Sequence, residues 1–116
     1  MTTSTGPQAL PLRPAVHHIL LALAGGDLHG LGIAEEIETA SEGVVELGPG
    51  TLYRSLAEMT DAGLIEPVEP PSAGADPRRK YYAITAAGRT LLSRETARLA
   101  RLVEAARERR VLPEGA

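Results

Sequence analysis

The residues best suited to chemistry are hydrogen-bond donors and cations in two short stretches. The first stretch carries a hydroxyl, a phenol and a guanidinium, on Thr51, Tyr53 and Arg54. The second stretch is a run of three cations, Arg78, Arg79 and Lys80. Such groups donate hydrogen bonds and bring positive charge, which suits anionic oxygen atoms such as those of phosphates. A run of charges is more often a solvated surface. The structural elements around both stretches must therefore show whether these residues have a functional role.

The first stretch lies in a predicted helix from Gly48 to Gly63. Pro49 suits the first turn, where its missing N–H costs nothing, and Gly63 suits the left-handed conformation that follows many helices. One apolar stripe has spacings of four and three residues, at Leu52, Leu56 and Met59. At 100° per residue, Arg54 lies opposite this stripe and Thr51 and Tyr53 lie on its flanks. An ordinary core helix has the same pattern, so neighbouring elements are needed to support a functional role.

Composition bounds the class of protein. The chain has 116 residues, of which 43% are apolar and 23% charged, as in a single globular domain. It has no cysteine, which excludes disulfides, thiolate metal sites and a cysteine nucleophile. No apolar run approaches the roughly 18–20 residues of a membrane span, and the first residues lack a signal-peptide pattern. We expect a cytoplasmic protein with no membrane partner.

Charge is unevenly distributed along the chain. The net charge is −3, but residues 1–88 hold five Lys and Arg against eleven Asp and Glu, which gives −6. Residues 89–116 hold seven Arg against four Glu, which gives +3. Three of the five cations in the first part are adjacent, at residues 78–80. A local cluster matters more to a phosphate backbone than the total, because screening limits reach to about 8–10 Å.

The order of elements follows from periodicity and turn residues. We expect residues 1–13 to be a flexible lead-in and a helix to run from Pro14 to the Gly25-Gly26 pair. A turn at 27–30, in which His29 holds the start of the next helix, precedes an acidic helix at 31–40. Residues 44–47 are β-prone and predict a short edge strand before the helix that carries Arg54.

A β-hairpin with a long tip follows. Residues 64–69 and 79–85 predict two strands, and the proline-rich segment 70–77 predicts the loop between them. Tyr81 and Tyr82 alternate along the second strand, so one should be in the core and the other should face outward. A loop of that length is often functional.

Thr85 is a good N-cap for a last helix, from Ala86 to about Arg110. Its apolar residues exceed what a small domain needs to cover itself, and they predict a dimer contact: Leu92, Leu99, Leu102, Val103 and Ala106. Arginines beside this stripe would repel across a parallel pair. We therefore expect an antiparallel or crossed pair, with Glu95, Glu104 and Glu108 opposite arginines of the other copy.

These elements predict a mainly α fold with a small β-hairpin wing. Residues 14–85 would form a winged helix-turn-helix domain, and residues 86–112 a long C-terminal dimerisation helix. In such domains the helix after the turn enters the DNA major groove and the hairpin is the wing.

Three motifs resemble the PadR family of bacterial transcriptional regulators. They are L-L-A-L-A-G-G-D-L-H-G at 20–30, G-P-G-T-L-Y-R-S-L-A-E-M-T-D-A-G-L-I at 48–65 and R-R-K-Y-Y-A-I-T-A-A-G at 78–88. They occur in the family's order and at near-family spacing, and are specific in combination. One departure is Leu31, where the family usually has Tyr; any polar role of that Tyr is lost. The short tail matches the family's small subclass, which has one C-terminal helix.

The resemblance implies a dimeric DNA-binding repressor with the last helix as the dimer contact. It also implies that Thr51 and Tyr53 lie at the DNA-proximal start of the recognition helix. With them we assign Arg54 to phosphate or a guanine edge, and Arg78, Arg79 and Lys80 to the DNA backbone or minor groove. The expected partners are double-stranded DNA and a second copy of the chain; the sequence names neither the operator nor an inducer.

Other classes of function have less support. Adjacent histidines on a helix point about 100° apart, so His17 and His18 do not share one metal ion easily, and we expect no metal and no cofactor. No Gly-rich phosphate loop or supported Ser/His/acid set is present, so we expect no catalytic residues and no enzyme. The open alternative is a winged-helix module for protein–protein contact without DNA, which the acidic balance favours.

Overall fold

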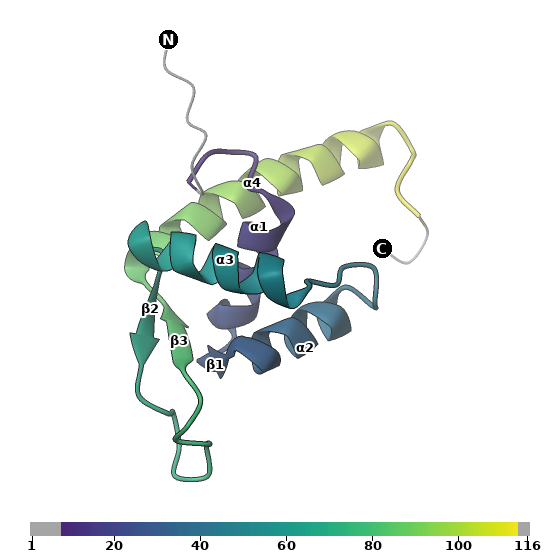
Figure 1. Ribbon diagram of the computed structural model, residues 1–116. Helices are drawn as coiled ribbons and strands as arrows, with labels where there is room; N and C mark the ends of the chain where they lie inside the picture. Colours follow the sequence, from purple (N-terminus) through teal and green to yellow (C-terminus); the bar gives the residue numbers. More distant parts are fainter. Residues whose placement is uncertain (1–7, 114–116) are drawn as a thin grey trace.

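The computed structural model describes residues 8–113 (Figure 1). In chain order its elements are α1 (Pro14–Ala24), β1 (Leu28–His29), α2 (Gly30–Ala40), α3 (Pro49–Asp61), β2 (Ile65–Val68), β3 (Tyr81–Ile84) and α4 (Ala86–Glu108). The three first helices pack around one core, the sheet lies at one end, and the wing extends from it (Figure 1). This is a winged helix-turn-helix with a long last helix, as the sequence predicts.

The core contains the apolar stripes that periodicity identifies. From α1 these are Val16, Ile19, Leu20 and Leu23, which are at most 1% exposed. Leu52, Leu56 and Met59 of α3 are buried against them, as are Ile33 and Ile37 of α2. One narrow face of α3 is thus buried, and its other faces reach the surface.

The sheet is antiparallel with strand order β1-β3-β2. The predicted hairpin is confirmed, although its strands are shorter and the connection spans residues 69–80. The third strand is Leu28–His29, which the sequence predicted as a turn, and it pairs with Tyr82 and Tyr81. A two-residue strand has too little pattern to be recognised before its partner is known.

The predicted edge strand at residues 44–47 is wrong. Glu42 and Gly43 have φ angles of 54° and 80°, so the chain turns there instead of extending. The Ser41 hydroxyl accepts a hydrogen bond from the Val45 N–H at 3.0 Å, so this N–H is not available for pairing with a strand. The sheet consists of β1, β3 and β2, and these β-prone residues form only the connection to α3.

The expectation that one of the two adjacent tyrosines faces outward is also wrong. Tyr81 and Tyr82 are 6% and 8% exposed. Tyr82 lies in the core, whereas Tyr81 is covered by the edge-on ring of His29, with centroids 5.3 Å apart. The Tyr81 hydroxyl accepts a hydrogen bond from the Asp76 N–H at 3.1 Å, so the wing connection also folds over it.

Glu95 is a buried carboxylate in α4, only 2% exposed. Its Oε2 accepts a hydrogen bond from the Leu12 N–H at 2.7 Å, and its Oε1 accepts from Arg98 Nε. Leu12 is itself buried, so the described part of the predicted lead-in packs on the domain. The expectation that Glu95 faces an arginine of a second copy is therefore wrong, because its two oxygens are used inside the chain.

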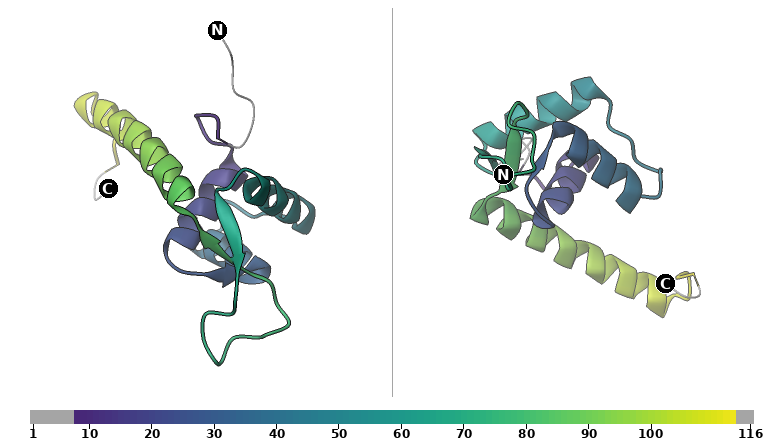
Figure 2. Two further views of the ribbon diagram at one scale, coloured as in Figure 1. Left: turned by 90° about the vertical axis from the view of Figure 1, so that its left-hand side faces the viewer. Right: turned by 90° about the horizontal axis from the view of Figure 1, so that it is seen from below.

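The second half of α4 extends beyond the domain, as the two views of Figure 2 show. Its buried residues, Gly88, Leu91, Leu92 and Glu95, all lie in the first half. From Thr96 to Glu108 no residue is buried within this chain. Within residues 8–113, no helix combines the length and the apolar character needed to cross a membrane.

Candidate nucleic-acid interface

Helix α3 begins and ends as its sequence dictates. Gly48 precedes it in an extended conformation and Pro49 occupies the first turn. At the other end Gly63 has φ 75°, and the Leu64 N–H donates to the Met59 carbonyl at 2.9 Å, which closes the helix in a Schellman motif. Thr51, Tyr53 and Arg54 are all exposed on its free side, in agreement with the periodicity.

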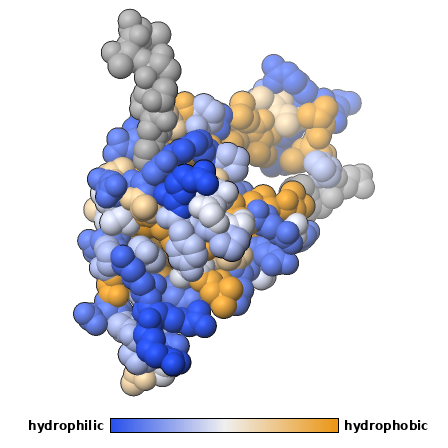
Figure 3. Space-filling view, viewed as in Figure 1, coloured by the Kyte–Doolittle hydropathy of each residue, from blue (hydrophilic) through white to orange (hydrophobic). Residues whose placement is uncertain are grey.

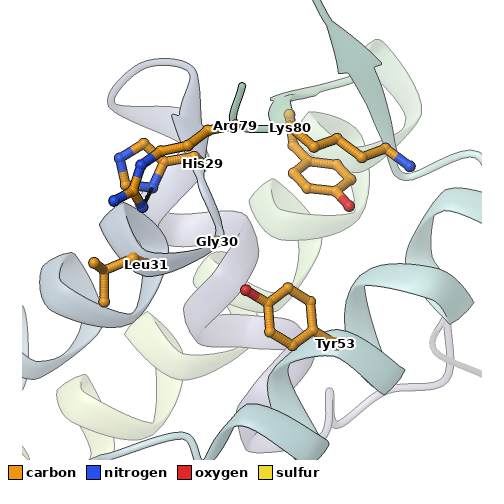
Figure 4. A pocket seen from close by; sticks show the side chains of 7 residues that line it. His29, Gly30, Leu31, Tyr53, Arg79 and Lys80 are labelled. Carbon is orange, nitrogen blue, oxygen red and sulfur yellow. Dashed lines mark hydrogen bonds between the residues drawn. The ribbon is translucent and has the colours of Figure 1, made fainter. Parts of the chain in front are cut away.

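Tyr53 lies across from the start of α2. Its side chain is 57% exposed, and its hydroxyl points toward Gly30 (Figure 4). A Cβ at residue 30 would lie 3.0 Å from that hydroxyl oxygen, so the absence of a side chain at Gly30 makes room for the phenol. His29 caps α2, because its Nδ1 accepts a hydrogen bond from the Gly32 N–H at 3.0 Å. The predicted role of His29 at the helix start is confirmed.

A hollow of about 300 Å³ lies between α2, α3 and the base of the wing. Its lining residues are His29, Gly30, Leu31, Tyr53, Arg79, Lys80 and Tyr82. Arg79 reaches His29, with Nη1 3.5 Å from Nδ1, whereas the Lys80 side chain extends away from that pair (Figure 4). The hollow therefore brings together one predicted residue of α3 and two predicted residues of the wing. Below, it is called the wing pocket.

The three wing cations differ in how free they are. Asp76 pairs with Arg78 at 3.2 Å and with Arg79 at 3.5 Å. The backbone N–H of Arg78, and then its side chain, donate to the Asp76 carboxylate and hold its pKa below the usual range. Lys80 has no carboxylate partner among the described residues, and its Nζ lies 5.6 Å from the centre of the Tyr82 ring. Lys80 is thus the cation with most of its charge available.

Arg54 and Thr51 lie on the other side of α3. They line a second hollow of about 370 Å³ together with Arg13, Pro14, Ala15, Leu47, Ser55 and Glu58. Arg13 Nη2 donates to Glu58 Oε2, which links the start of α1 to α3. Below, this hollow is called the α1 pocket. The sequence did not identify Arg13, because an isolated arginine before a helix has no distinguishing spacing.

The two histidines outside the wing pocket, His17 and His18, are adjacent in α1. His17 and His18 have ring centres 5.4 Å apart and planes tilted by 55°. Burial lowers the pKa of His17 below its usual value, and the neighbouring His18 lowers it further. Across residues 8–113, no three His, Cys, Asp or Glu side chains are placed to hold an ion.

The five residues predicted for a dimer contact are in different environments. Leu92 is buried in the core of its own domain, while Leu99 and Ala106 are half-buried. Leu102 and Val103 are 55% and 45% exposed. Figure 3 shows apolar surface on the protruding part of α4, at upper right, and a mainly hydrophilic wing below. The apolar surface that α4 leaves uncovered thus lies toward its C-terminal half.

Comparison with known proteins places the chain in a family. The model of the transcriptional regulator PadR-like family matches residues 19–94, from within α1 to the first half of α4. The chain belongs to this family. The match includes all the donors and cations of α3 and the wing described above. The resemblance carried by the three sequence motifs is thereby confirmed.

One curated relative of this PadR-like chain is an uncharacterised 37.1 kDa protein in transposon Tn4556 of Streptomyces fradiae. The two are 42% identical over 84 residues, which are 72% of this chain and 22% of the relative. The PadR-like chain thus spans about a fifth of that protein's length.

Two solved structures show the same fold. A PadR family transcription regulator from Clostridium difficile R20291 is 26% identical, with a TM-score of 0.61 over 79% of this chain and 95% of that one. Bacillus subtilis PadR in complex with operator DNA is 25% identical, with a TM-score of 0.56 over 66% of this chain and 43% of that one.

Proposed function

We propose that this PadR-like chain is a sequence-specific DNA-binding transcriptional regulator, a repressor that acts as a homodimer on an inverted-repeat operator. The observation that carries the proposal is the wing pocket, where Tyr53 of α3 meets Arg79 and Lys80 of the wing. A phenol and two cations from segments far apart in the sequence converge beside the exposed face of one helix. That arrangement suits a helix lying in the major groove with a wing on the adjacent backbone.

Each candidate residue has a role set by its chemistry. Arg54, exposed and without an ion-pair partner among the described residues, offers five donors to a guanine edge or a phosphate. The hydroxyls of Thr51 and Tyr53 donate to phosphates. The wing cations Arg78, Arg79 and Lys80 contact the backbone or minor groove, with Lys80 contributing most because Asp76 partly neutralises the other two.

The acidic total charge does not oppose this role. The acidic residues of α2 that are exposed, Glu35, Glu36 and Glu38, belong to the helix that supports α3 rather than to α3 itself. At physiological salt, charges farther than about 8–10 Å from a phosphate are largely screened. The charges on α3 and the wing, which include Arg54 and the cations of residues 78–80 as well as Glu58 and Asp61, therefore decide the local attraction.

The dimer would form through α4. Its second half carries Leu99, Leu102, Val103 and Ala106 on a segment that its own domain does not bury. Leu92 belongs to the core of its own domain, and only its small exposed part lines a shallow groove on α4 with Ser93, Ala97 and Ala100. A two-fold dimer places its two α3 helices on half-sites about one helical turn, ~34–36 Å, apart. The relative seen with operator DNA adds support at the level of the family.

Selection of bound duplexes from random DNA, followed by binding isotherms at several salt concentrations, tests the proposal. The expected result is an inverted repeat bound by two chains, with affinity that falls steeply as salt rises because counterions are released. A single half-site bound by one chain would contradict the homodimer. No salt-dependent binding of any duplex would favour the alternative, a winged-helix module for protein contact. In-vitro transcription from a promoter holding the selected site then tests repression, which should increase with protein concentration.

A further inference from the structure

We infer that Arg13, at the start of α1, contacts a DNA phosphate on the backbone strand opposite the one that the wing contacts. The inference rests on the proposed function, since it assumes that α3 lies in the major groove. It goes further by assigning a DNA contact to α1 and to the α1 pocket.

The two pockets lie on opposite flanks of α3. At 100° per residue, Tyr53 projects toward one flank, whereas Thr51, Ser55 and Glu58 project toward the other. The structure agrees, because Tyr53 lines the wing pocket and the other three line the α1 pocket. Arg54 projects outward between the flanks and leans toward the α1 pocket, which it also lines.

A helix in the major groove lies between two phosphate backbones. The groove is about 12 Å wide, so each flank of the helix faces one strand. The wing flank already offers Tyr53, Arg79 and Lys80 to its strand. Without Arg13 and its neighbours, the other strand would face α3 with few donors.

Arg13 has the exposure and the spare donors for such a contact. Its side chain is 51% exposed, and its one ion-pair partner among the described residues is Glu58, reached through Nη2. A guanidinium has five N–H donors, so several remain for a phosphate. Glu58 holds the side chain across the pocket, beside the hydroxyls of Thr51 and Ser55. The carboxylate does not leave the pocket negative, because Arg13 and Arg54 together outweigh it.

The ordinary explanation is a surface ion pair that only ties α1 to α3. Such pairs contribute little to stability and have no effect on how DNA affinity depends on salt. The two readings therefore differ in the salt slope. One phosphate contact contributes about 0.9 to the slope of log K against log salt, which corresponds to roughly a five- to tenfold affinity at 0.1 M salt.

The test measures duplex binding across a salt series for the full chain and three variants. Arg13→Ala should lower the slope by about 0.9 and weaken the selected site and random DNA by the same factor. Arg13→Lys, which keeps the charge, should restore most of the slope. Arg94→Ala, an exposed α4 arginine with no ion-pair partner among residues 8–113, is the matched control and should leave the slope unchanged. Thermal unfolding of each variant confirms that the folded fraction is equal.

Single neutral methylphosphonates in the operator then locate the contact. A methylphosphonate at a contacted phosphate lowers the affinity of the unaltered chain. In the Arg13→Ala variant this loss of affinity should disappear at one phosphate. In an Arg79→Ala, Lys80→Ala double variant it should disappear at a phosphate on the opposite strand. The inference would be overturned by an unchanged salt slope in Arg13→Ala, or by both variants becoming insensitive to methylphosphonates on the same strand. Either result would leave the proposed DNA binding standing. If the unaltered chain binds no duplex, the proposed function fails and the inference falls with it.

Discussion

The hydroxyl oxygen of Tyr53 lies 3.0 Å from the position that a Cβ of Gly30 would occupy. This relationship joins the first residue of α2 to α3, and it does so at the edge of the wing pocket. A side chain at position 30 would therefore crowd Tyr53, while the backbone at Gly30 is ordinary helix.

Gly30→Ala should therefore displace the Tyr53 side chain with little effect on the fold. An exposed phenol can rotate away from the added methyl group, so we expect a change in unfolding free energy below about 1 kcal/mol. Affinity for the selected duplex should fall, because the Tyr53 hydroxyl moves from its place beside the wing cations. Gly32→Ala is the control: its Cβ would meet neighbours only at 3.5 Å or beyond, an ordinary contact. Equal duplex affinities for the two variants would show that the position of Tyr53 does not matter for binding.

The sequence predicted the helices and the hairpin because each has its own periodicity and punctuation. Pro49 and Gly63 delimit α3, and Thr85 caps α4, with its hydroxyl accepting from the Gly88 N–H at 3.0 Å. The wrong predictions are at residues whose structure depends on partners distant in the sequence. Leu28–His29 is a strand only because β3 has a free edge, and Tyr81 is buried only because His29 and the wing connection cover it.

Only part of the candidate site could be predicted from the sequence. Residue type and spacing identified the donors of α3 and the run of cations, and the structure brings Tyr53, Arg79 and Lys80 to one pocket. The contact between Arg13 and Glu58 does not follow from spacing, because these residues are 45 positions apart. The pairing of Asp76 with Arg78 and Arg79 is local, but it depends on how the wing connection turns. Sequence alone therefore overstated the free charge of Arg78 and Arg79 and missed the α1 pocket.

Arg54 and the wing cations should differ in what they contribute to DNA binding. If Arg54 contacts a base edge, Arg54→Ala should cost about 1–3 kcal/mol for the selected site and less for random DNA. Changing Arg79 and Lys80 together to Ala should weaken both duplexes by similar factors and flatten the salt slope, since phosphates are the same at every position. Isotherms at several salt concentrations measure both effects. An unchanged slope in the wing variant would mean that these cations are only solvated.

Gly88→Ala should destabilise the fold. A Cβ there would lie 2.2 Å from the Leu64 carbonyl oxygen and 2.9 Å from Ile84 Cγ1. The carbonyl is held by the Thr85 N–H at 3.1 Å, so α4 would have to move away from the sheet. Overpacking of this kind costs about 1–3 kcal/mol, measurable by urea unfolding. Gly50→Ala, which meets no neighbour within 4 Å, should instead leave stability equal or slightly higher. Equal stability of the two variants would contradict the close approach.

Glu95 should make stability depend on pH in the acid range. The hydrogen bond from Arg98, assisted by the Leu12 N–H, lowers the pKa of Glu95 despite its burial. A carboxylate whose pKa is lower in the folded chain contributes stability that is fully present above its unfolded pKa, about 4.3, and is lost as the pH falls through the folded pKa. Glu95→Gln should therefore be less stable than the unaltered chain at pH 7, and the difference should shrink below about pH 4. A difference that stays constant down to pH 3 would show that the charge is not involved.

The dimer contact is best tested on residues that the domain does not need for itself. Removal of α4 after Gly88 would also remove Leu91, Leu92 and Glu95, which belong to the core, so a monomer produced that way would be ambiguous. Leu102→Arg avoids this, because the side chain is 55% exposed and its loss leaves the domain packed. In a dimer the Leu102 side chain would be buried, which stabilises the dimer by about 25 cal/mol per Å² of apolar area, and a charge there would lack a partner.

Sedimentation should show the unaltered chain at twice its 12.2 kDa mass and the Leu102→Arg variant as a monomer with weakened operator binding. Val44→Arg, at a residue 85% exposed in the connection between α2 and α3, should remain dimeric. A Leu102→Arg variant that still sediments as a dimer would exclude the protruding half of α4 as the contact.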